Sequence, residues 1–258
     1  MPTPYPAELY AKLHLGNPGD LAFYREQCRG AETILELGCG YGRVLEALSD
    51  DNHRLVVGLD MNRGLLELAQ RRLREATVAP PELVRGDMRR FAFGRKFDRI
   101  LIPYSAIYCL LSIADLHACL SKIAEHLNPE GLLLFDAYSA DAFHHEAANE
   151  ENQGAEDDSA SDEADEVACI DHEGTTYHVV ERSDWSREDQ RLDVVYLHEP
   201  RQGGPSIATR LEHRYLLSEQ IEPLLEAAGL QLISLAGDYI GTQITDDSEI
   251  IVATAKLR

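Results

Sequence analysis

The sequence predicts an α/β protein in which a doubly wound, mainly parallel β-sheet carries an antiparallel β insertion. Two observations predict this fold class. From Thr33 to Tyr138, apolar strand-like runs alternate with stretches of helical spacing, as in parallel sheets covered by helices on both faces. From Tyr177 to Tyr215, β-forming and polar residues alternate, which is typical of an antiparallel meander.

The elements of the first part follow in regular order. Strands are expected at Thr33–Leu37, Leu55–Leu59, Phe97–Ile102 and Leu132–Phe135, with helices at Gly42–Ser49, Arg63–Glu75 and Ile113–Leu127. In the third helix Leu116, Leu120 and Ile123 form an apolar face, and Asn128-Pro129 ends the helix.

The second part is expected to contain the meander and the end of the core. Its strands are Tyr177–Trp185, Arg191–His198 and Ile207–Tyr215; a helix then runs from Ser218 to Gly229, followed by strands Leu230–Tyr239 and Glu249–Ala255. We divide the chain into an N-terminal helical cap segment (1–30), the main core (31–144), an acidic flexible loop (145–168), the antiparallel β cap (169–216) and a C-terminal helix with strands that completes the core (217–258).

The acidic segment dominates the charge of the chain. Lys and Arg total 24 against 45 Asp and Glu, and ten acidic residues without a basic one lie between Glu146 and Glu166. A segment so poor in apolar residues is expected to be a solvated loop, with a partner-binding tail as the alternative. The net charge of −21 disfavours nucleic acid as a partner, because phosphate backbones bind basic surfaces.

Targeting and metal signals are also weak. The longest nearly uncharged run, Ile100–Ala114, is shorter than the about 20 apolar residues of a membrane span, and no secretion signal is evident. The five cysteines are scattered, with no CxxC spacing, which disfavours a disulfide framework and a structural zinc site. We therefore expect a cytoplasmic protein with no membrane segment and no metal.

The strongest chemical signal is a glycine loop between a buried strand and a helix, Glu36-Leu-Gly-Cys-Gly-Tyr-Gly42. Gly38 and Gly40 allow a tight turn and the close approach of a ligand. The third glycine of a dinucleotide-binding GxGxxG would stand at Arg43, and no Lys-Ser/Thr pair of a phosphate-binding loop is present. The spacing favours a nucleoside ligand without a pyrophosphate.

Two carboxylates follow at later strand ends. Asp60 ends the second strand, 22 residues after Gly38, where an acidic side chain can accept hydrogen bonds from ribose hydroxyls. Asp87 follows a further short strand-like run and could accept from an exocyclic amine such as that of adenine, with Met61 and Met88 as apolar walls.

Each of these residues has a structural alternative. The glycines could form an ordinary turn, and Glu36 could be a paired core carboxylate rather than a contact to the cofactor. Asp60 could be the N-cap of the following helix, and Asp87 a turn residue.

Taken in order, these motifs resemble the signature of class I S-adenosylmethionine-dependent methyltransferases: Glu36–Gly42, Gly58-Leu-Asp60, Gly86-Asp87-Met88 and Leu127-Asn-Pro-Glu-Gly-Leu132. The resemblance covers residues 30–140 and the segment from Ser218. It implies a seven-stranded Rossmann-like sheet with one antiparallel strand and S-adenosyl-L-methionine as cofactor. It also implies that Gly38 and Gly40 contact the methionine portion, Asp60 the ribose, and Asp87 with Met88 the adenine. Short stretches, Gly86-Asp-Met-Arg and Gly94-Arg-Lys-Phe97, are most similar to small-molecule enzymes that include sugar N-methyltransferases.

Candidates for the acceptor pocket are tyrosines. Ile102-Pro-Tyr-Ser-Ala106 follows the fourth strand but lacks the leading Asn/Asp of the Asn/Asp-Pro-Pro-Tyr motif found in methyltransferases that act on nucleobases or glutamine. Tyr104 and Tyr108 fall where the resemblance directs the methyl group, and Tyr10 and Tyr138 could line the same mouth; simple packing is the alternative for each.

The predicted function is the transfer of a methyl group from S-adenosylmethionine to a small-molecule acceptor, an amine or an ionisable hydroxyl. No residue is assigned as catalytic, because an amine can attack the activated methyl and lose its proton afterwards. Two other functions stay open: an NAD-linked oxidoreductase and a non-catalytic S-adenosylmethionine-binding module.

Overall fold

The computed structural model describes residues 5–49, 54–77, 79–145 and 165–258. The chain forms two compact units. The meander unit comprises Met1–Leu15 and Phe143–Tyr215, and the core unit comprises Gly16–Ala142 and Leu216–Arg258. The first predicted helical segment is therefore shared, since α1 (Ala7–Leu13) belongs to the meander unit and α2 (Asp20–Gln27) to the core unit.

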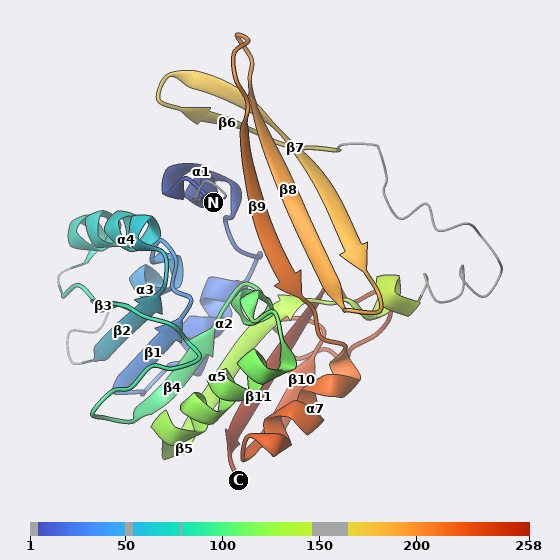
Figure 1. Ribbon diagram of the computed structural model, residues 1–258. Coiled ribbons are helices and arrows are strands. Elements are labelled where there is room, and N and C mark those ends of the chain that lie inside the picture. Colours follow the sequence, from blue (N-terminus) through green and yellow to red (C-terminus); the bar gives the residue numbers. More distant parts are fainter. Residues whose placement is uncertain (1–4, 50–53, 78, 146–164) are drawn as a thin grey trace. The chain divides into compact units, whose positions relative to one another are not determined.

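The core unit is built on a seven-stranded sheet in the order β10-β11-β5-β4-β1-β2-β3 (Figure 1). The strands are β1 (Thr33–Leu37), β2 (Leu55–Asp60), β3 (Glu82–Arg85), β4 (Phe97–Ile102), β5 (Leu127–Tyr138), β10 (Leu230–Ala236) and β11 (Ile250–Leu257). Only β11 runs against its neighbours; the pairs among β1 to β5 are parallel. The predicted fold class, including the single antiparallel strand, is confirmed.

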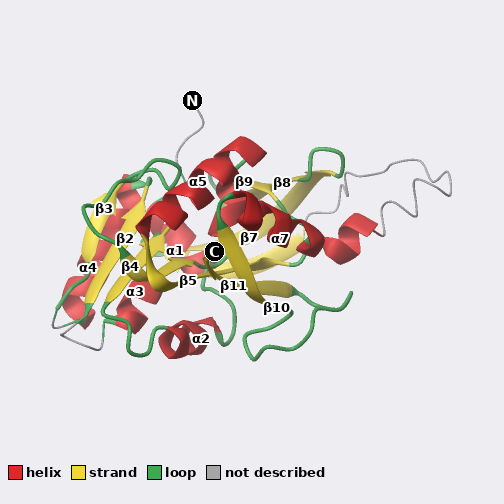
Figure 2. Cartoon of the chain, turned by 90° about the horizontal axis from the view of Figure 1, so that it is seen from below, coloured by secondary structure: helices red, strands yellow, loops and turns green. Residues whose placement is uncertain are grey.

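Helices cover both faces of this sheet. They are α2, α3 (Arg43–Leu48), α4 (Arg63–Ala76), α5 (Ile113–His126) and α7 (Ser218–Ala227), with a 3-10 turn η1 (Ala106–Cys109) after β4. Figure 2 shows α5 and α7 on one face and α2 on the other. Right-handed crossovers require this, because the chain moves outward from β1 in one direction through β2 and β3 and in the other through β4 and β5.

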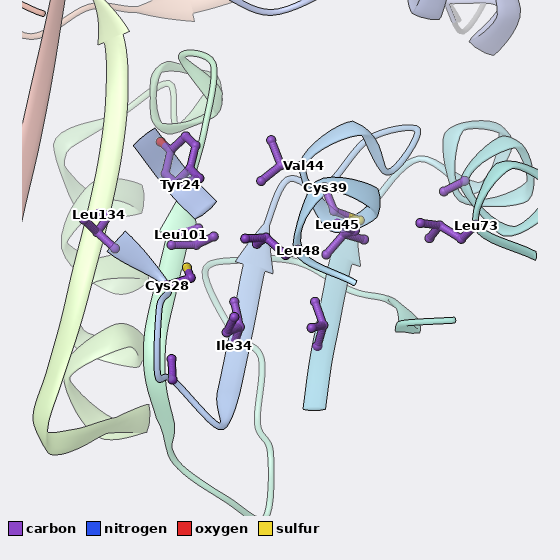
Figure 3. Close-up of a cluster of buried hydrophobic side chains, with 13 residues drawn as sticks. Tyr24, Cys28, Ile34, Cys39, Val44, Leu45, Leu48, Leu73, Leu101 and Leu134 are labelled. Atoms are coloured by element: carbon purple, nitrogen blue, oxygen red, sulfur yellow. The ribbon is translucent and has the colours of Figure 1, made fainter. Parts of the chain in front are cut away.

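The core of this unit joins the central strands to the helices on one face. Ile34 of β1, Leu101 of β4 and Leu134 of β5 are fully buried beside Leu45 of α3 and Leu73 of α4 (Figure 3). These apolar side chains are the ones that the strand-like runs and the helical spacing place on inward faces. The cluster fixes the strands relative to α3, the helix that follows the glycine loop.

The meander unit contains a second, four-stranded antiparallel sheet. Its strands, in spatial order, are β6 (Asp165–His172), β7 (Thr175–Ser186), β8 (Arg191–Pro200) and β9 (Ile207–Arg214). β6 is not among the three strands that the alternation predicts; it begins with acidic residues of low strand propensity and forms because β7 offers it a pairing edge. Leu9 of α1 is buried against Ile170 and Val179, which ties the N-terminal helix to this sheet.

Two further expectations concern the acidic loop and the lack of a membrane segment. Most of the predicted acidic loop, residues 146–164, lies outside the described residues. Within the described parts of the chain, no helix combines the length and the apolar character that crossing a membrane requires.

We predict that a methyl group at Gly58 overpacks the core. A Cβ there would lie 2.4 Å from Leu45 Cδ1 and 2.9 Å from Cys39 Sγ. Gly58→Ala should lower the free energy of unfolding by about 1–3 kcal/mol, measured by urea denaturation. Gly94→Ala is the matched control, since a Cβ at Gly94 meets no atom within 4 Å. Equal stability of the two variants would contradict the close packing of β2 against α3.

Candidate functional site

The predicted site residues of the core unit come together at one end of the strands of the seven-stranded sheet, which we call the carboxyl edge. Because β1 to β4 are parallel, their carboxyl ends meet there. Gly38 follows β1, Asp60 ends β2, Asp87 follows β3 and Tyr104 follows β4. The neighbouring strands β1 and β4 lead into helices that cover opposite faces, and ligands of open α/β sheets bind at such a switch point.

The glycine loop, residues 38–42, is held tightly against β2. The amides of Gly38 and Cys39 donate to the Leu59 carbonyl oxygen at 2.8 and 3.1 Å. Gly38 has a φ of +72°, and a Cβ there would lie 2.9 Å from the Ala106 Cβ. Glycine is required for both reasons, and the loop therefore lies directly against the turn after β4.

Asp60 ties the glycine loop to the end of β2. Its Oδ2 accepts from the Gly40 amide at 2.7 Å, and its Oδ1 accepts from the Asn62 amide at 2.7 Å. Gly40 has a φ of +52°, and a Cβ built on it meets no atom within 4 Å, so the loop is open on that side. Carboxylate oxygens have further lone pairs, which leaves Asp60 able to accept from a ligand hydroxyl.

The helix N-cap alternative for Asp60 is wrong. Asn62 is the N-cap residue of α4, and its side-chain oxygen accepts from the amides of Gly64 and Leu65 at 2.9 and 3.2 Å. Asp60 is thus not needed to begin the helix. Burial raises the pKa of Asp60, although hydrogen bonds from Asn62 and Gly40 oppose this effect.

Glu36 is a buried carboxylate beside the loop. Its residue is 3 % exposed, and among the described residues its Oε2 has no hydrogen-bond partner. Burial raises its pKa to about 8, against the opposing charge of Arg43. A core carboxylate that served only structure would have both oxygens satisfied. The unsatisfied oxygen instead fits a cationic ligand group, such as the ammonium of the methionine portion of S-adenosylmethionine.

Arg43, which stands where a dinucleotide fingerprint has glycine, has a structural partner. Its guanidinium forms a two-pronged ion pair with Asp20 of α2, whose side chain is 2 % exposed, with Nη1 donating to Oδ1 at 3.0 Å. The guanidinium also covers Gly16, where a Cβ would lie 2.1 Å from Arg43 Cζ. The position thus ties α2 and the preceding segment to the start of α3.

The three residues predicted to contact adenine, Asp87, Met88 and Met61, differ in how far the protein already engages them. Both oxygens of Asp87 accept from Arg89, and Oδ2 also accepts from Arg90 at 3.1 Å. The hydrogen bond from Arg89 lowers the pKa of Asp87 to about 2, so its carboxylate is charged and already engaged. Met88 Cε would lie 3.6 Å from a Cβ at Gly38, beside the loop, and Met61 is 57 % exposed.

Two of the candidate tyrosines are in ring contact. Tyr108 and Tyr138 pack edge-on with ring centroids 4.8 Å apart. Tyr108 is fully buried, and its hydroxyl donates to the carbonyl oxygens of Tyr138 and Leu216 at 3.0 and 3.3 Å. The packing alternative therefore suits Tyr108, whereas Tyr104 is only partly buried at the end of β4.

The turn after β4 has an unusual backbone. Tyr104 and Ser105 are consecutive non-glycine residues in the left-handed region, with φ of 53° and 59°. Each such residue costs about 1–2 kcal/mol. Left-handed conformations of this kind persist where the surroundings hold them, and they gather at functional sites.

Sequence reasoning missed Asp136, which holds this turn. Asp136 is fully buried near the end of β5 and accepts from the Tyr104 amide at 3.1 Å. The Tyr24 hydroxyl donates to its Oδ1 at 2.5 Å and the Tyr239 hydroxyl to its Oδ2 at 3.0 Å. Burial raises the pKa of Asp136, although the Tyr24 hydrogen bond opposes this. A carboxylate directly after the apolar run Leu132–Phe135 was the available signal, but its partners lie far away in the sequence.

The remaining candidate, Tyr10, belongs to the meander unit. It lies on α1, with its ring 5.3 Å from that of Tyr5 and 4.3 Å from that of His14. The same unit holds a set that could bind a metal ion: Glu8, His172 and Glu173 offer ligand atoms within 4.8 Å of one another. The Glu8 and His172 side chains are also close enough for an ion pair, at 3.6 Å.

Comparison with known proteins points to methyltransferases. Residues 34–131 match a family described as "Methyltransferase domain". The dTDP-3-amino-3,6-dideoxy-alpha-D-glucopyranose N,N-dimethyltransferase of Streptomyces fradiae is 32% identical over 140 residues, which are 51% of this chain and 52% of that protein. The dTDP-3-amino-3,4,6-trideoxy-alpha-D-glucopyranose N,N-dimethyltransferase of Streptomyces venezuelae is 30% identical over 140 residues, 51% of this chain and 56% of that protein. The chain thus spans about half the length of the curated relatives it matches.

Solved structures share the fold over nearly the whole chain. An S-adenosylmethionine-dependent methyltransferase from Clostridium acetobutylicum superposes with a TM-score of 0.74 at 20% identity, covering 97% of each chain. The CcbJ methyltransferase from Streptomyces caelestis has a TM-score of 0.74 at 18% identity, covering 94% of this chain and 90% of that one. The likeness includes both the core unit and the meander unit.

We predict that Asp60→Ala weakens the binding of S-adenosylhomocysteine by about tenfold to a hundredfold, because the glycine loop loses its anchor and the ribose of the ligand loses a hydrogen-bond acceptor. Calorimetric titration with S-adenosylhomocysteine measures this. Asp98→Ala is the matched control: Asp98 lies at the opposite edge of the sheet, where it accepts from the amides of Glu32 and Thr33 at 3.0 Å. An Asp60 variant that binds as tightly as the Asp98 variant would exclude Asp60 from the site.

Glu36 predicts a pH-dependent stability. Its pKa is raised from 4.5 to about 8 in the folded protein, so across this window the folded state keeps a proton that the unfolded state releases. The free energy of unfolding of the wild type should therefore fall as the pH rises toward about 8 and then level off. Glu36→Gln should lack this decline, so its advantage over the wild type grows from about pH 5 to about pH 8 in urea titrations. Parallel curves for the two proteins would contradict a buried, protonated Glu36.

Proposed function

We propose that this chain, whose residues 34–131 match a methyltransferase domain, is a class I S-adenosylmethionine-dependent enzyme that transfers a methyl group to the amine of a small molecule. The observation that carries the proposal is the buried Glu36 carboxylate beside the open glycine loop, with an oxygen that has no partner among the described residues. A ligand with a cationic amino-acid portion and a nucleoside portion satisfies both features.

The residues at the carboxyl ends of β1 and β2 would each contact a different part of the cofactor. Glu36 would accept from the ammonium group, and the backbone of Gly38 and Gly40 would lie against the methionine portion. Asp60 would accept from the ribose hydroxyls with the lone pairs that Gly40 and Asn62 leave open. When bound, S-adenosylmethionine supplies a methyl group already activated on its sulfonium sulfur.

The adenine would lie beyond the ribose, toward β3. Met88 and Met61 supply apolar surface there, and thioether side chains adapt well to a flat ring. Asp87 is held by Arg89, so it can receive the exocyclic amine of adenine only by sharing its lone pairs with the guanidinium.

The chain's own chemical contribution is alignment and exclusion of water. The attacking amine must approach in line with the methyl carbon and the sulfur, and holding it there accelerates the reaction strongly. The turn with Tyr104 lies on the β4 side of the loop, away from the proposed ribose and adenine contacts on β2 and β3. We assign the acceptor to this side.

The other two functions are less well supported. For an NAD-linked oxidoreductase, the third glycine of the fingerprint is replaced by Arg43, whose guanidinium pairs with Asp20. A non-catalytic binding module would bind the cofactor without turnover. The acidic charge favours a small molecule over nucleic acid, and the scattered cysteines favour the cytoplasm.

We predict methyl transfer to an amine when the purified protein is incubated with S-adenosylmethionine and a panel of acceptors. The panel contains a dTDP-linked amino sugar, because relatives of 30–32% identity are named for such substrates, together with a free amino sugar, a simple primary amine and an aliphatic alcohol. Amine-dependent release of S-adenosylhomocysteine is the expected result. Turnover of the alcohol alone would contradict the amine assignment, and cofactor binding without any turnover would favour the non-catalytic module.

A further inference from the structure

Asp136 gathers side chains from two segments of the core unit that are far from it in the sequence. Tyr24 comes from α2 and Tyr239 from the segment after β10; Asn17 precedes α2. The Asn17 side chain donates to the Tyr239 hydroxyl at 3.1 Å and lies 3.5 Å from Asp136 Oδ2. A buried charge with donors on both oxygens is fixed in one orientation, because any rotation would leave a donor or the charge unsatisfied.

The same residue holds the left-handed turn by two kinds of contact. Its carboxylate accepts from the Tyr104 amide at 3.1 Å, and its main-chain carbonyl oxygen accepts from the Ser105 amide at 2.9 Å. These are the two residues with φ of 53° and 59°. The turn is therefore held in a strained conformation by its neighbour on β5.

The turn matters because it packs directly against the glycine loop at which we propose that the cofactor binds. Ala106, the next residue, stands so close to Gly38 that a Cβ on that glycine would lie 2.9 Å away. In the described part of the chain, the hydrogen bonds to the Asp136 carboxylate come from Asn17, Tyr24, Tyr104 and Tyr239, none of which is a proposed cofactor residue. Asp136 acts on the site through the turn after β4, to which it is hydrogen-bonded directly.

We propose that Asp136 is a positioning residue that holds the Tyr104–Ser105 turn in its left-handed form and so sets the acceptor side of the methyl-transfer site. This rests on the proposed function, because the turn has an acceptor side only if an acceptor is methylated there. Asp136 itself is fully buried. Its effect is transmitted by the backbone of Tyr104 and Ser105.

The first test measures the local stability of the turn, and it needs no methyl acceptor. Amide hydrogen exchange, followed by mass spectrometry on a peptide that covers residues 103–106, should be faster in Asp136→Ala than in the wild type by about tenfold or more. Asp141→Ala is the matched control: Asp141 is also a buried carboxylate just after β5, but it accepts from the Ser218 amide at 3.1 Å and not from the turn. Exchange at 103–106 that is unchanged in Asp136→Ala, or equally raised in both variants, overturns the proposal.

The second test distinguishes an effect on the use of the acceptor from an effect on the binding of the cofactor. With the amine that the wild type methylates, Asp136→Ala should lose about tenfold or more in kcat/KM for the acceptor, while its affinity for S-adenosylhomocysteine changes by less than about threefold. Asp136→Asn keeps one oxygen for the Tyr104 amide and should fall between the two. Equal losses for acceptor and cofactor would overturn the assignment to the acceptor side.

A rescue experiment distinguishes backbone positioning from a general loss of packing. Glycine adopts a left-handed φ without strain, so Ser105→Gly should recover part of the kcat/KM that Asp136→Ala loses. Ser105→Gly alone removes the hydrogen bond between Ser105 Oγ and the Tyr138 amide, at 3.1 Å, and serves as the reference for the double variant. A double variant with no more activity than Asp136→Ala contradicts the strain argument.

Failure of the proposed function would give a different result from failure of the positioning role of Asp136. A wild type that binds S-adenosylhomocysteine but methylates no amine of the panel refutes the amine methyltransferase assignment and, with it, the acceptor side. The hydrogen-exchange result then still decides whether Asp136 holds the turn.

Discussion

The hydrogen bond from the Gly40 amide to Asp60 Oδ2, 2.7 Å long, closes the glycine loop onto the end of β2. Together with the amides that bind the Leu59 carbonyl oxygen, it fixes the chain between β1 and α3. α3 can therefore begin directly after Gly42, and its apolar side chains reach the cluster of Figure 3. The open side of Gly40, the position of Glu36 and the contact with the turn after β4 all depend on this closure.

Three carboxyl groups, those of Glu36, Asp60 and Asp136, lie toward the carboxyl ends of the parallel strands. Burial raises the pKa values of Glu36, Asp60 and Asp136, which means that each carboxylate lacks part of the compensation it would have in water. The Arg43 guanidinium, whose charge opposes the rise of the Glu36 pKa, is already paired with Asp20. A ligand that carries positive charge, as the sulfonium and ammonium groups of S-adenosylmethionine do, would stabilise the edge by compensating these carboxylates.

The amino ends of the same strands show what a purely structural carboxylate looks like. Asp98 accepts from two amides, from the Thr33 hydroxyl and from Asn128 at 2.7 Å. Burial alone would raise its pKa, but these hydrogen bonds hold it below its usual value. Asp98 is satisfied by the protein, whereas Glu36 keeps an oxygen that none of the described residues satisfies. This difference in hydrogen bonding distinguishes Asp98, which ties the strands together, from Glu36, which we propose contacts the ligand.

The sequence by itself determined the sheet and the glycine loop at which we propose that the cofactor binds. The apolar runs and helical spacing fixed the order of strands and helices because these periods reflect which side chains are buried. The glycines and the distance to Asp60 are local, so their placement at one edge followed from parallel strands alone. β6 was missed, since its pairing with β7 and not its composition makes it a strand.

Only the tertiary structure decided which polar groups meet. It made Asn62 the cap of α4, engaged Asp87 with Arg89 and buried Tyr108 against Tyr138. Above all, it brought Tyr24 and Tyr239 to Asp136 across 112 and 103 residues of sequence. No periodicity encodes such contacts, because they depend on how α2 and the segment after β10 pack around the end of β5. The sequence therefore specified the side of the site that we assign to the cofactor, and the packing of distant segments specified the side that we assign to the acceptor.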